Sequence, residues 1–356
     1  MPMPMLISSR TSSLRPLLLA ACLSLAAVAS HAADAPEPVT VDAGFRPAEQ
    51  AGKLLKVAEG QALKGLKKVA VPLFSVEFVT ADSERAENSG FGNVGRSSAS
   101  VAFQLKGVEE PDFAAITQAL YNGFVADLQA AGLEVLTQEQ VAASPTYRKL
   151  AAGGVPSPIK SSDAITLAPA GMAIYGFNKV QSGGSGSSSK LFGALAQMGS
   201  GFSAVGAAMD GPAVQQELGA ALLEVQLKVS FVQLNNLSKG FLGRLSGSSQ
   251  VAYEVRPMVA SATFSVQSGT RGSLTLTQPL ALDKAAIAEV RTVPTSTAEK
   301  AGLVAVAILS VAIGGNSSTS SDAKEAVADP ARYREIVGGG LSQATQMFVA
   351  RLKKGE

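Results

Sequence analysis

The chain has 356 residues, with 30 lysine and arginine residues against 28 aspartate and glutamate residues, one histidine, one cysteine and no tryptophan. A formal net charge of +2 provides no strong basic field, so we exclude a nucleic-acid partner. A single cysteine excludes a disulfide-stabilised fold, so a hydrophobic core must hold the chain together.

Residues 1–32 have the layout of a secretory signal peptide. Arg10 and Arg15 give a basic start, residues 17–29 are mostly apolar, and residues 30–32 (Ser-His-Ala) supply small side chains before a cleavage site. The apolar stretch is shorter than the roughly 20 residues that a membrane-spanning helix needs. We therefore expect export across a bacterial inner membrane and cleavage before Ala33.

A lipoprotein signal is the alternative reading of the same segment. Leu19-Ala20-Ala21-Cys22 fits the pattern at which bacterial lipoproteins are cut and lipidated on cysteine, and a lipid anchor would fix the protein to a membrane. However, the apolar stretch continues past Cys22, which favours cleavage after Ala32. The expected location is the periplasm or the outer membrane, with lipidation of Cys22 as the less favoured form.

Cleavage after Ala32 removes 32 of the 356 residues and leaves a mature chain of 324. It also removes Cys22, His31 and two of the 30 basic residues, so 28 basic residues face 28 acidic ones. Without histidine or cysteine there is no Ser-His-Asp triad, Cys-His pair, His-ligated metal or CxxC redox pair. We expect no catalytic residue, no cofactor and no metal, and thus a protein that is not an enzyme.

The first part of the mature chain is predicted to start with an extension and two strands. The extension contains a short helical pattern around Leu54, Val57 and Leu63, and the first strand carries an irregularity at Pro72. A polar loop with glycine and asparagine turn signals separates the strands, which we expect to pair with each other. The extension covers residues 33–66, the first strand 67–79, the loop 81–98 and the second strand 99–108.

The clearest helix begins at Glu110, and Gly132 ends it in the manner of a helix C-cap. Its apolar residues recur at helical spacing: Phe113, Ile116, Leu120, Phe124 and Leu128. A short strand follows at residues 133–136, and then a helix at 137–150 that Thr137 caps. A break at 153–158 precedes a further strand at 172–180. Residues 67–181 are therefore predicted to form one α/β domain.

Residues 182–219 form a Gly/Ser/Ala-rich segment. A Gly/Ser linker at 182–189 leads into residues 191–209, which carry no charge but several glycines. The length approaches that of a membrane span, yet the glycine and serine residues dilute its apolar character. The sequence favours a flexible surface or oligomer-contact segment over membrane insertion.

Residues 220–295 are predicted to be β-rich, and residues 296–356 to form C-terminal helices. The expected strands cover 224–233, 241–245, 250–255, 260–266 and 273–277. Ser296 with Glu299 forms a capping-box pattern before an apolar run, which is too short to span a membrane and predicts a buried helix. The apolar run covers residues 301–313 and the loop after it 314–321. The two closing helices cover residues 330–337 and 341–353.

Three short motifs match functional patterns but lie in the wrong context. Gly90-x-Gly92-x-x-Gly95 fits the dinucleotide fingerprint, but a strand rather than a helix is predicted after it. Ser321-x-x-Lys324 fits a serine–lysine acylase pattern without its partner motifs. The acids at Glu109, Glu110 and Asp112 are those that a helix N-terminus favours. We assign no site residue from these motifs.

The order of elements from residue 67 to residue 295 resembles that of one envelope family. A Lys-Lys-Val-Ala-Val strand at 67–71, the long helix ending at Gly132 and the strand and helix after it are similar to the anticodon-binding-like periplasmic domain of the curli production assembly/transport component family. Residues 173–177 (Ala-Ile-Tyr-Gly-Phe), 225–240 and 251–255 are similar to later strands and turns of this family.

The predicted elements together indicate an α+β fold, with a periplasmic βαβ-containing domain followed by a β-rich second half and C-terminal helices. The resemblance implies a ring-forming homo-oligomer in an outer-membrane secretion or surface-fibre assembly system, with a secreted substrate or an envelope protein as partner. A soluble periplasmic binding or scaffold module that contacts a partner protein is the alternative. A hydrolase that uses aspartate or glutamate is a third, less favoured class.

Overall fold

The larger of two open β-sheets contains ten strands. The computed structural model describes residues 36–89, 96–175, 202–236, 251–293 and 317–354. The main path of the sheet has the order β1-β12-β10-β9-β3-β8-β7, and β11, β2 and β6 pair beside it. The strands are β1 (Val39–Thr40), β2 (Leu55–Ala58), β3 (Lys68–Val79), β6 (Glu134–Val135), β7 (Ile159–Lys160), β8 (Ala164–Leu167), β9 (Ala221–Asn236), β10 (Val251–Ser268), β11 (Thr270–Leu276) and β12 (Leu280–Ala281).

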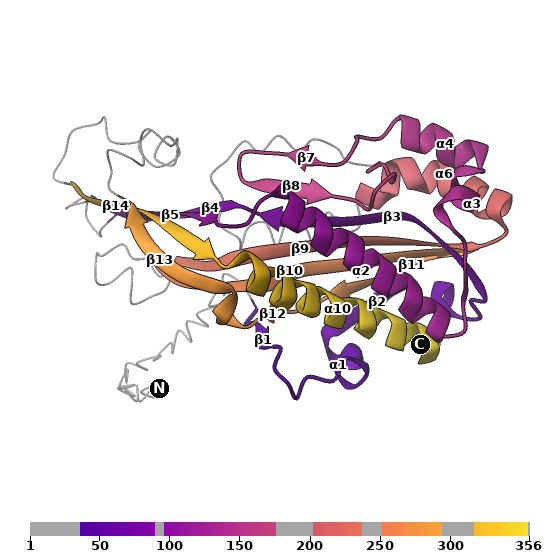
Figure 1. The fold of residues 1–356 in the computed structure, drawn as a ribbon, viewed down its shortest axis with the longest axis horizontal. Coiled ribbons are helices and arrows are strands. Elements are labelled where there is room, and N and C mark those ends of the chain that lie inside the picture. Colours follow the sequence, from indigo (N-terminus) through magenta and orange to yellow (C-terminus); the bar gives the residue numbers. More distant parts are fainter. Residues whose placement is uncertain (1–35, 90–95, 176–201, 237–250, 294–316, 355–356) are drawn as a thin grey trace, which may run out of the picture. The chain divides into compact units, whose positions relative to one another are not determined.

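Three long strands form the middle of this sheet (Figure 1). β9 and β10 are an antiparallel hairpin whose pairs run from Asn236↔Val251 to Leu222↔Gln267. β3 pairs with β9 in parallel, from Val69↔Ala221 to Phe78↔Val229. One sheet therefore joins strands from the first and second halves of the chain.

A second, four-stranded sheet has the order β13-β14-β5-β4. β4 (Ala81–Ser89) begins two residues after β3 ends, so the chain passes directly from the large sheet into the small one at Thr80. β5 (Arg96–Lys106) pairs with β4 in antiparallel and with β14 (Ser317–Ala328) in parallel. β13 (Ile287–Val293) pairs with the other side of β14.

Helices α2 (Glu110–Ala130) and α10 (Pro330–Lys354) lie side by side across one face of the large sheet (Figure 1). The short helix α1 (Pro47–Leu54) packs on α10. Helices α3 (Gln138–Ala142), α4 (Pro145–Ala152) and α6 (Phe202–Leu218), with two 3-10 turns at Gly60–Leu63 and Lys284–Ala286, complete the described elements. The described structure is thus mixed α/β with a C-terminal helix.

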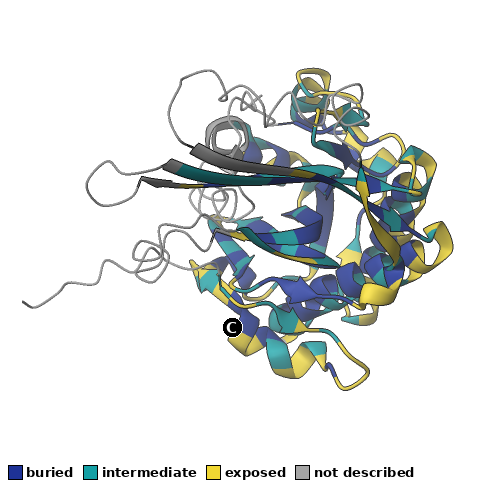
Figure 2. Cartoon of the chain, turned by 90° about the vertical axis from the view of Figure 1, so that its left-hand side faces the viewer, coloured by how far each residue is buried: buried dark blue, intermediate teal, exposed yellow. Residues whose placement is uncertain are grey.

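The core lies between these helices and the large sheet, where aromatic side chains from both layers meet. Phe264 of β10 stacks on Phe348 of α10 with 4.5 Å between ring centroids, and Phe78 of β3 stacks on Phe113 of α2 at 4.6 Å. Burying each phenylalanine stabilises the fold by about 1.5–3 kcal/mol. Figure 2 shows the buried residues gathered on the sheets and inner helix surfaces, with exposed residues along the outer sides of the helices.

Helix α2 begins and ends as its sequence predicts. The backbone N–H of Glu109 donates to Asp112 at 3.1 Å, so the acids at this end form a capping box, and Gly132 follows the helix at φ 88°. The short strand after it is confirmed as β6, and Thr137 caps α3 through Gln140. The predicted helix to residue 150 is wrong in one respect, because Ser144 and Pro145 start a separate helix.

Several strand predictions are wrong. Residues 81–98 are not a loop but contain β4 and the start of β5, and β5 pairs with β4 and β14 rather than with β3. The expected strands at 250–255 and 260–266 are one strand, β10, which passes Pro257 at a register shift. The strand expected at 172–180 is not formed in its described residues, 172–175, where only an isolated bridge between Val155 and Ile174 occurs.

Other elements also differ from the predictions. Val57 belongs to β2 rather than to a helix, residues 202–218 form α6, and part of the loop expected at 314–321 belongs to β14. The two closing helices are one, since α10 continues through Gly338–Gly340. The predicted elements at 182–189, 241–245 and 301–313, and the Ser296–Glu299 capping box, lie outside the described residues.

Tyr333 offers a test of this packing. Its ring is fully buried near Phe113, with 6.1 Å between centroids, and its hydroxyl has no hydrogen-bond partner among the described residues. Because an unpaired buried hydroxyl costs about 1–3 kcal/mol, Tyr333→Phe is expected to raise the free energy of unfolding by roughly 1 kcal/mol. Chemical denaturation of the two proteins measures this difference, and a loss of stability would show that the hydroxyl is bound.

Candidate functional site

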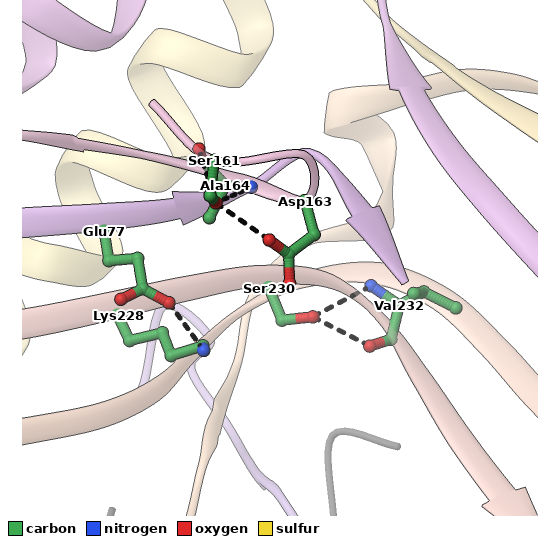
Figure 3. Close-up of polar contacts among 7 residues, drawn as sticks. All are labelled: Glu77, Ser161, Asp163, Ala164, Lys228, Ser230 and Val232. Carbon is green, nitrogen blue, oxygen red and sulfur yellow. Dashed lines mark hydrogen bonds and ion pairs between the residues drawn. The ribbon is translucent and has the colours of Figure 1, made fainter. Parts of the chain in front are cut away.

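Polar and charged side chains, among them the buried Lys228 and Ser230, gather where the chain passes from the large sheet to the small one (Figure 3). Lys228 of β9 forms an ion pair with Glu77 of β3 at 2.6 Å, and their side chains are 11% and 31% exposed. In the adjacent turn, the hydroxyl of Ser161 donates to Asp163 at 2.8 Å, and the carbonyl of Asp163 accepts from the backbone N–H groups of Thr80 and Ala81. These contacts fix the point at which β3 gives way to β4.

Asp82, the second residue of β4, lies within this charged environment. Burial raises the pKa of its carboxyl to about 7, and the nearby carboxylates of Glu84 and Asp163 act in the same direction. The backbone N–H of Ser83 and the ammonium of Lys228 oppose this rise. The carboxyl of Asp82 therefore titrates near neutral pH. The groups that shift its pKa all belong to neighbouring strands and turns of the same fold.

Asp82→Asn is expected to change the pH dependence of stability. Because the folded pKa lies above the unfolded value of 3.8, the ionised carboxyl destabilises the fold above pH 7, and this cost disappears as the pH falls below the unfolded value. Relative to Asp82→Asn, the wild type should gain about 1–2 kcal/mol between pH 8 and pH 4, after allowance for solvent screening. Urea unfolding at several pH values measures the gain, with the exposed Glu49→Gln as control. A wild type and a variant that change in parallel would contradict the assignment.

A second buried polar group joins three elements at Glu224 of β9. The hydroxyl of Tyr175 donates to its carboxylate at 3.4 Å, and Arg271 of β11 pairs with it at 3.5 Å. Burial raises the pKa of Glu224, opposed by Arg271 and by the hydrogen bond from Tyr175, while burial and the nearby Glu224 raise the pKa of the Tyr175 hydroxyl. The three side chains satisfy one another, which is the role of a structural contact between layers.

A shallow groove with a volume of about 510 Å³ runs between α2 and α10. Mostly small and apolar residues line it: Ala115, Ile116, Ala119, Leu120, Gly123, Ala331, Gly338 and Ser342. At its rim, Arg334 pairs with Asp112 at 3.5 Å. A methyl group added at Gly123 or Gly338 would meet no atom within 4 Å, so these glycines are not required by contacts inside the described structure.

The small sheet and the end of the β9–β10 hairpin form the third candidate region. Phe103 of β5 packs on Tyr253 of β10 with 4.9 Å between centroids, and the ammonium of Lys324 lies 5.5 Å from the centre of the same tyrosine ring. The register of the small sheet places the end of β4 and the starts of β5 and β14 together, through Ser89↔Arg96 and Arg96↔Ser317. Residues 90–95 connect β4 to β5, residues 237–250 connect β9 to β10, and residues 294–316 connect β13 to β14.

The residues selected by the sequence motifs have structural partners or lie outside the described part. Gly90, Gly92 and Gly95 lie outside it, although strands rather than a helix flank them on both sides. Lys324 donates to Thr292 at 3.3 Å, and Glu110 pairs with Lys160 at 2.5 Å. Among the motif residues whose side chains the structure describes, no pair suited to acid–base chemistry is formed.

The sequence prediction missed the buried charges of β9. The alternation over 224–233 predicts one apolar and one polar face, but the structure buries Glu224, Lys228 and Ser230 of the polar face as well. The partners of Glu224 and Lys228 come from β3, β11 and the chain after β8, which no local pattern identifies. The only local signal of this burial is a glutamate and a lysine on the polar face of an otherwise apolar strand.

Among the described residues, no group of three or more potential metal ligands occurs. No helix within the described ranges is long and apolar enough to cross a membrane. No family model matches the chain, and it matches neither a curated protein nor a solved structure. The site must therefore be interpreted from its own geometry.

Proposed function

We propose that this chain is a non-enzymatic cell-envelope protein that acts as an oligomeric component of an outer-membrane secretion or surface-fibre assembly system. The observation that carries the proposal is the four-stranded sheet β13-β14-β5-β4, in which the end of β4 and the starts of β5 and β14 lie together through Ser89↔Arg96 and Arg96↔Ser317. Among the described residues the outer strands of this sheet are β4 and β13, and an outer strand can pair with a strand of another chain.

The polar groups of the interior support a structural rather than a chemical role. Glu77 with Lys228, and Glu224 with Tyr175 and Arg271, connect neighbouring elements through ion pairs and hydrogen bonds. Buried ionisable groups that pair across strands fix the arrangement of those strands. A protein of this kind acts through the shape and the edges of its sheets.

A soluble periplasmic scaffold module is the second candidate, and the composition of β4 favours it. This nine-residue strand carries Asp82, Glu84, Arg85 and Glu87. Charged residues are costly on a surface that faces lipid but stable on one that faces water or a polar protein partner. In this function the same end of the fold would contact a partner protein in the periplasm.

Both functions require export, which we propose is directed by residues 1–32. The partners are then found in the periplasm or at the outer membrane: further copies of the chain, an envelope protein or a secreted substrate. The Cys22 alternative would add a lipid anchor to the same fold.

Cell fractionation followed by sedimentation analysis separates the two candidates. The full-length chain with a short tag after Glu356 is expressed in a Gram-negative host. Extraction only by detergent, as a large oligomer, supports the assembly component. Release by osmotic shock as a small species supports the scaffold module. Recovery of the protein from the cytosol would refute both.

A further inference from the structure

Strand β13 is the outer strand of the four-stranded sheet (Figure 1). One side pairs with β14 from Glu289↔Val327 to Val293↔Ala323, and no strand within the described residues pairs with the other side. Residues 288–292 are all exposed, whereas β14 beside them contains the buried Ala323 and Ala326. Every second residue of an outer strand directs its backbone N–H and C=O away from the sheet, where another strand can pair with them.

The sequence of β13, Ile-Ala-Glu-Val-Arg-Thr-Val, does little to prevent such pairing. It contains no proline and no lysine, the residues that commonly protect sheet edges, and β-branched residues favour its extended conformation. A register shift between Ile287 and Glu289 makes one end irregular. The five residues from Glu289 to Val293 nevertheless pair with β14 without a further register shift.

We propose that β13 pairs with β13 of a second copy of this chain, antiparallel and centred on Val290. A two-fold axis between the two Val290 residues places each residue opposite the one that lies equally far on the other side of Val290 in the second copy. The two opposing residues then lie on the same face of the sheet. Glu289 then lies opposite Arg291 of the second copy, and this pair occurs twice. The proposal rests on the proposed function and identifies one of its partners as the chain itself.

Charge fixes the register of this pairing. Centring the axis on Glu289 would place two glutamates opposite each other, and centring it on Arg291 would place two arginines opposite each other; both arrangements are unfavourable. Arg291 already pairs with Glu325 of β14 at 2.9 Å. With Glu289 of the second copy it would form a three-residue network across three strands, which orders the arginine before association.

An exposed apolar side chain at this edge supports the same arrangement. Val290 is 44% exposed, and it is one of three exposed large apolar residues in the described part of the chain. Val290 pairs with the buried Ala326, so it lies on the face of β13 that continues the packed side of the sheet. In the proposed pair, the two Val290 side chains cover each other.

The opposite edge of the sheet is less suited to a second copy. On β4, Glu84 and Ala86 are buried, and Arg85 already pairs with Glu87 of the same strand at 2.6 Å. An approaching strand would have to compete with these contacts. We therefore assign the contact between copies to β13.

Sedimentation velocity of the purified mature protein over a hundred-fold concentration range tests the proposal. The wild type is expected to form a dimer, and Glu289→Arg or Arg291→Glu should weaken it by at least about ten-fold, because each replaces two opposite-charge pairs by like-charge pairs. An equimolar mixture of the two variants should recover the dimer, since each arginine then faces a glutamate. Glu49→Arg, an equal charge change on exposed α1, should leave the wild-type dimer unchanged.

Three results would overturn the proposal. These are a wild type that stays monomeric at all concentrations, a dimer that persists in both variants, or a mixture that fails to recover it. Circular dichroism of each variant alone shows whether that variant is folded. A failure to form the dimer can therefore be distinguished from a failure to fold. A large envelope oligomer that persists unchanged in both Glu289→Arg and Arg291→Glu would refute this contact while leaving the proposed function standing.

Discussion

Phe348→Ala is expected to lower the free energy of unfolding by about 3–5 kcal/mol, the range for removing a fully buried phenylalanine. The Phe348 ring is fully buried and stacks on Phe264 of β10 at 4.5 Å and 4°, and it lies 5.9 Å from Phe124 of α2. One side chain thus connects the C-terminal helix to the sheet and to the other large helix. Its removal leaves a cavity that three rigid elements cannot close.

Denaturant unfolding measures this loss, and Phe348→Leu serves as the control. Leucine keeps most of the buried volume and loses only the ring contacts, so it should cost clearly less than alanine. If Phe348→Ala costs under about 1 kcal/mol, α10 does not pack on the sheet as described here.

Gly107→Ala is the second substitution with a large expected effect. Gly107 follows β5 at φ 82°, and a Cβ at this position would overlap the carbonyl oxygen of Ala328 at the end of β14. An alanine therefore adds a clash to the roughly 1–2 kcal/mol cost of a left-handed conformation. We expect a total loss of about 3 kcal/mol or more, with separation of β5 from β14.

Gly132→Ala is a matched control for this effect. Gly132 also has a left-handed backbone, at φ 88°, but a Cβ there would meet no atom within 4 Å. Its substitution should cost only the conformational part, about 1–2 kcal/mol. Equal losses of unfolding free energy in the two variants would contradict the close approach of β14 to Gly107.

Elements determined by local sequence could be predicted, and helix α2 is the clearest example. Its apolar spacing, its acidic first turn and Gly132 all lie within 24 residues, and the structure confirms both ends. The strand over 224–233 is likewise confirmed within β9, because its alternation is local. These signals are independent of distant contacts.

The elements that depend on distant contacts could not be predicted. β4 is mostly polar and is defined by its pairing with β5, and β14 pairs in parallel with a strand more than 200 residues away in sequence. The glycines at 338–340 predict a helix break, but α10 continues because its apolar residues pack on the sheet and Gly340 fits closely against Leu282. Tertiary packing overrides local propensity at these places.

The candidate surface was equally hidden from the sequence. The pattern over 273–277 predicts the strand that became β11, but nothing in residues 287–293 distinguishes an exposed outer strand from a loop. The proposed pairing of Glu289 with Arg291 of another copy can be inferred only once β13 is known to lie at an edge of the sheet. The resemblance to the curli production assembly/transport component family remains a prediction.

The most direct test of an exported, non-catalytic assembly protein is the intact mass of the chain recovered from fractionated cells. We expect an envelope protein of 324 residues beginning at Ala33, or a shortened, lipid-bearing form beginning at Cys22. All 356 residues in the cytosolic fraction, with the leader uncut, would contradict this expectation.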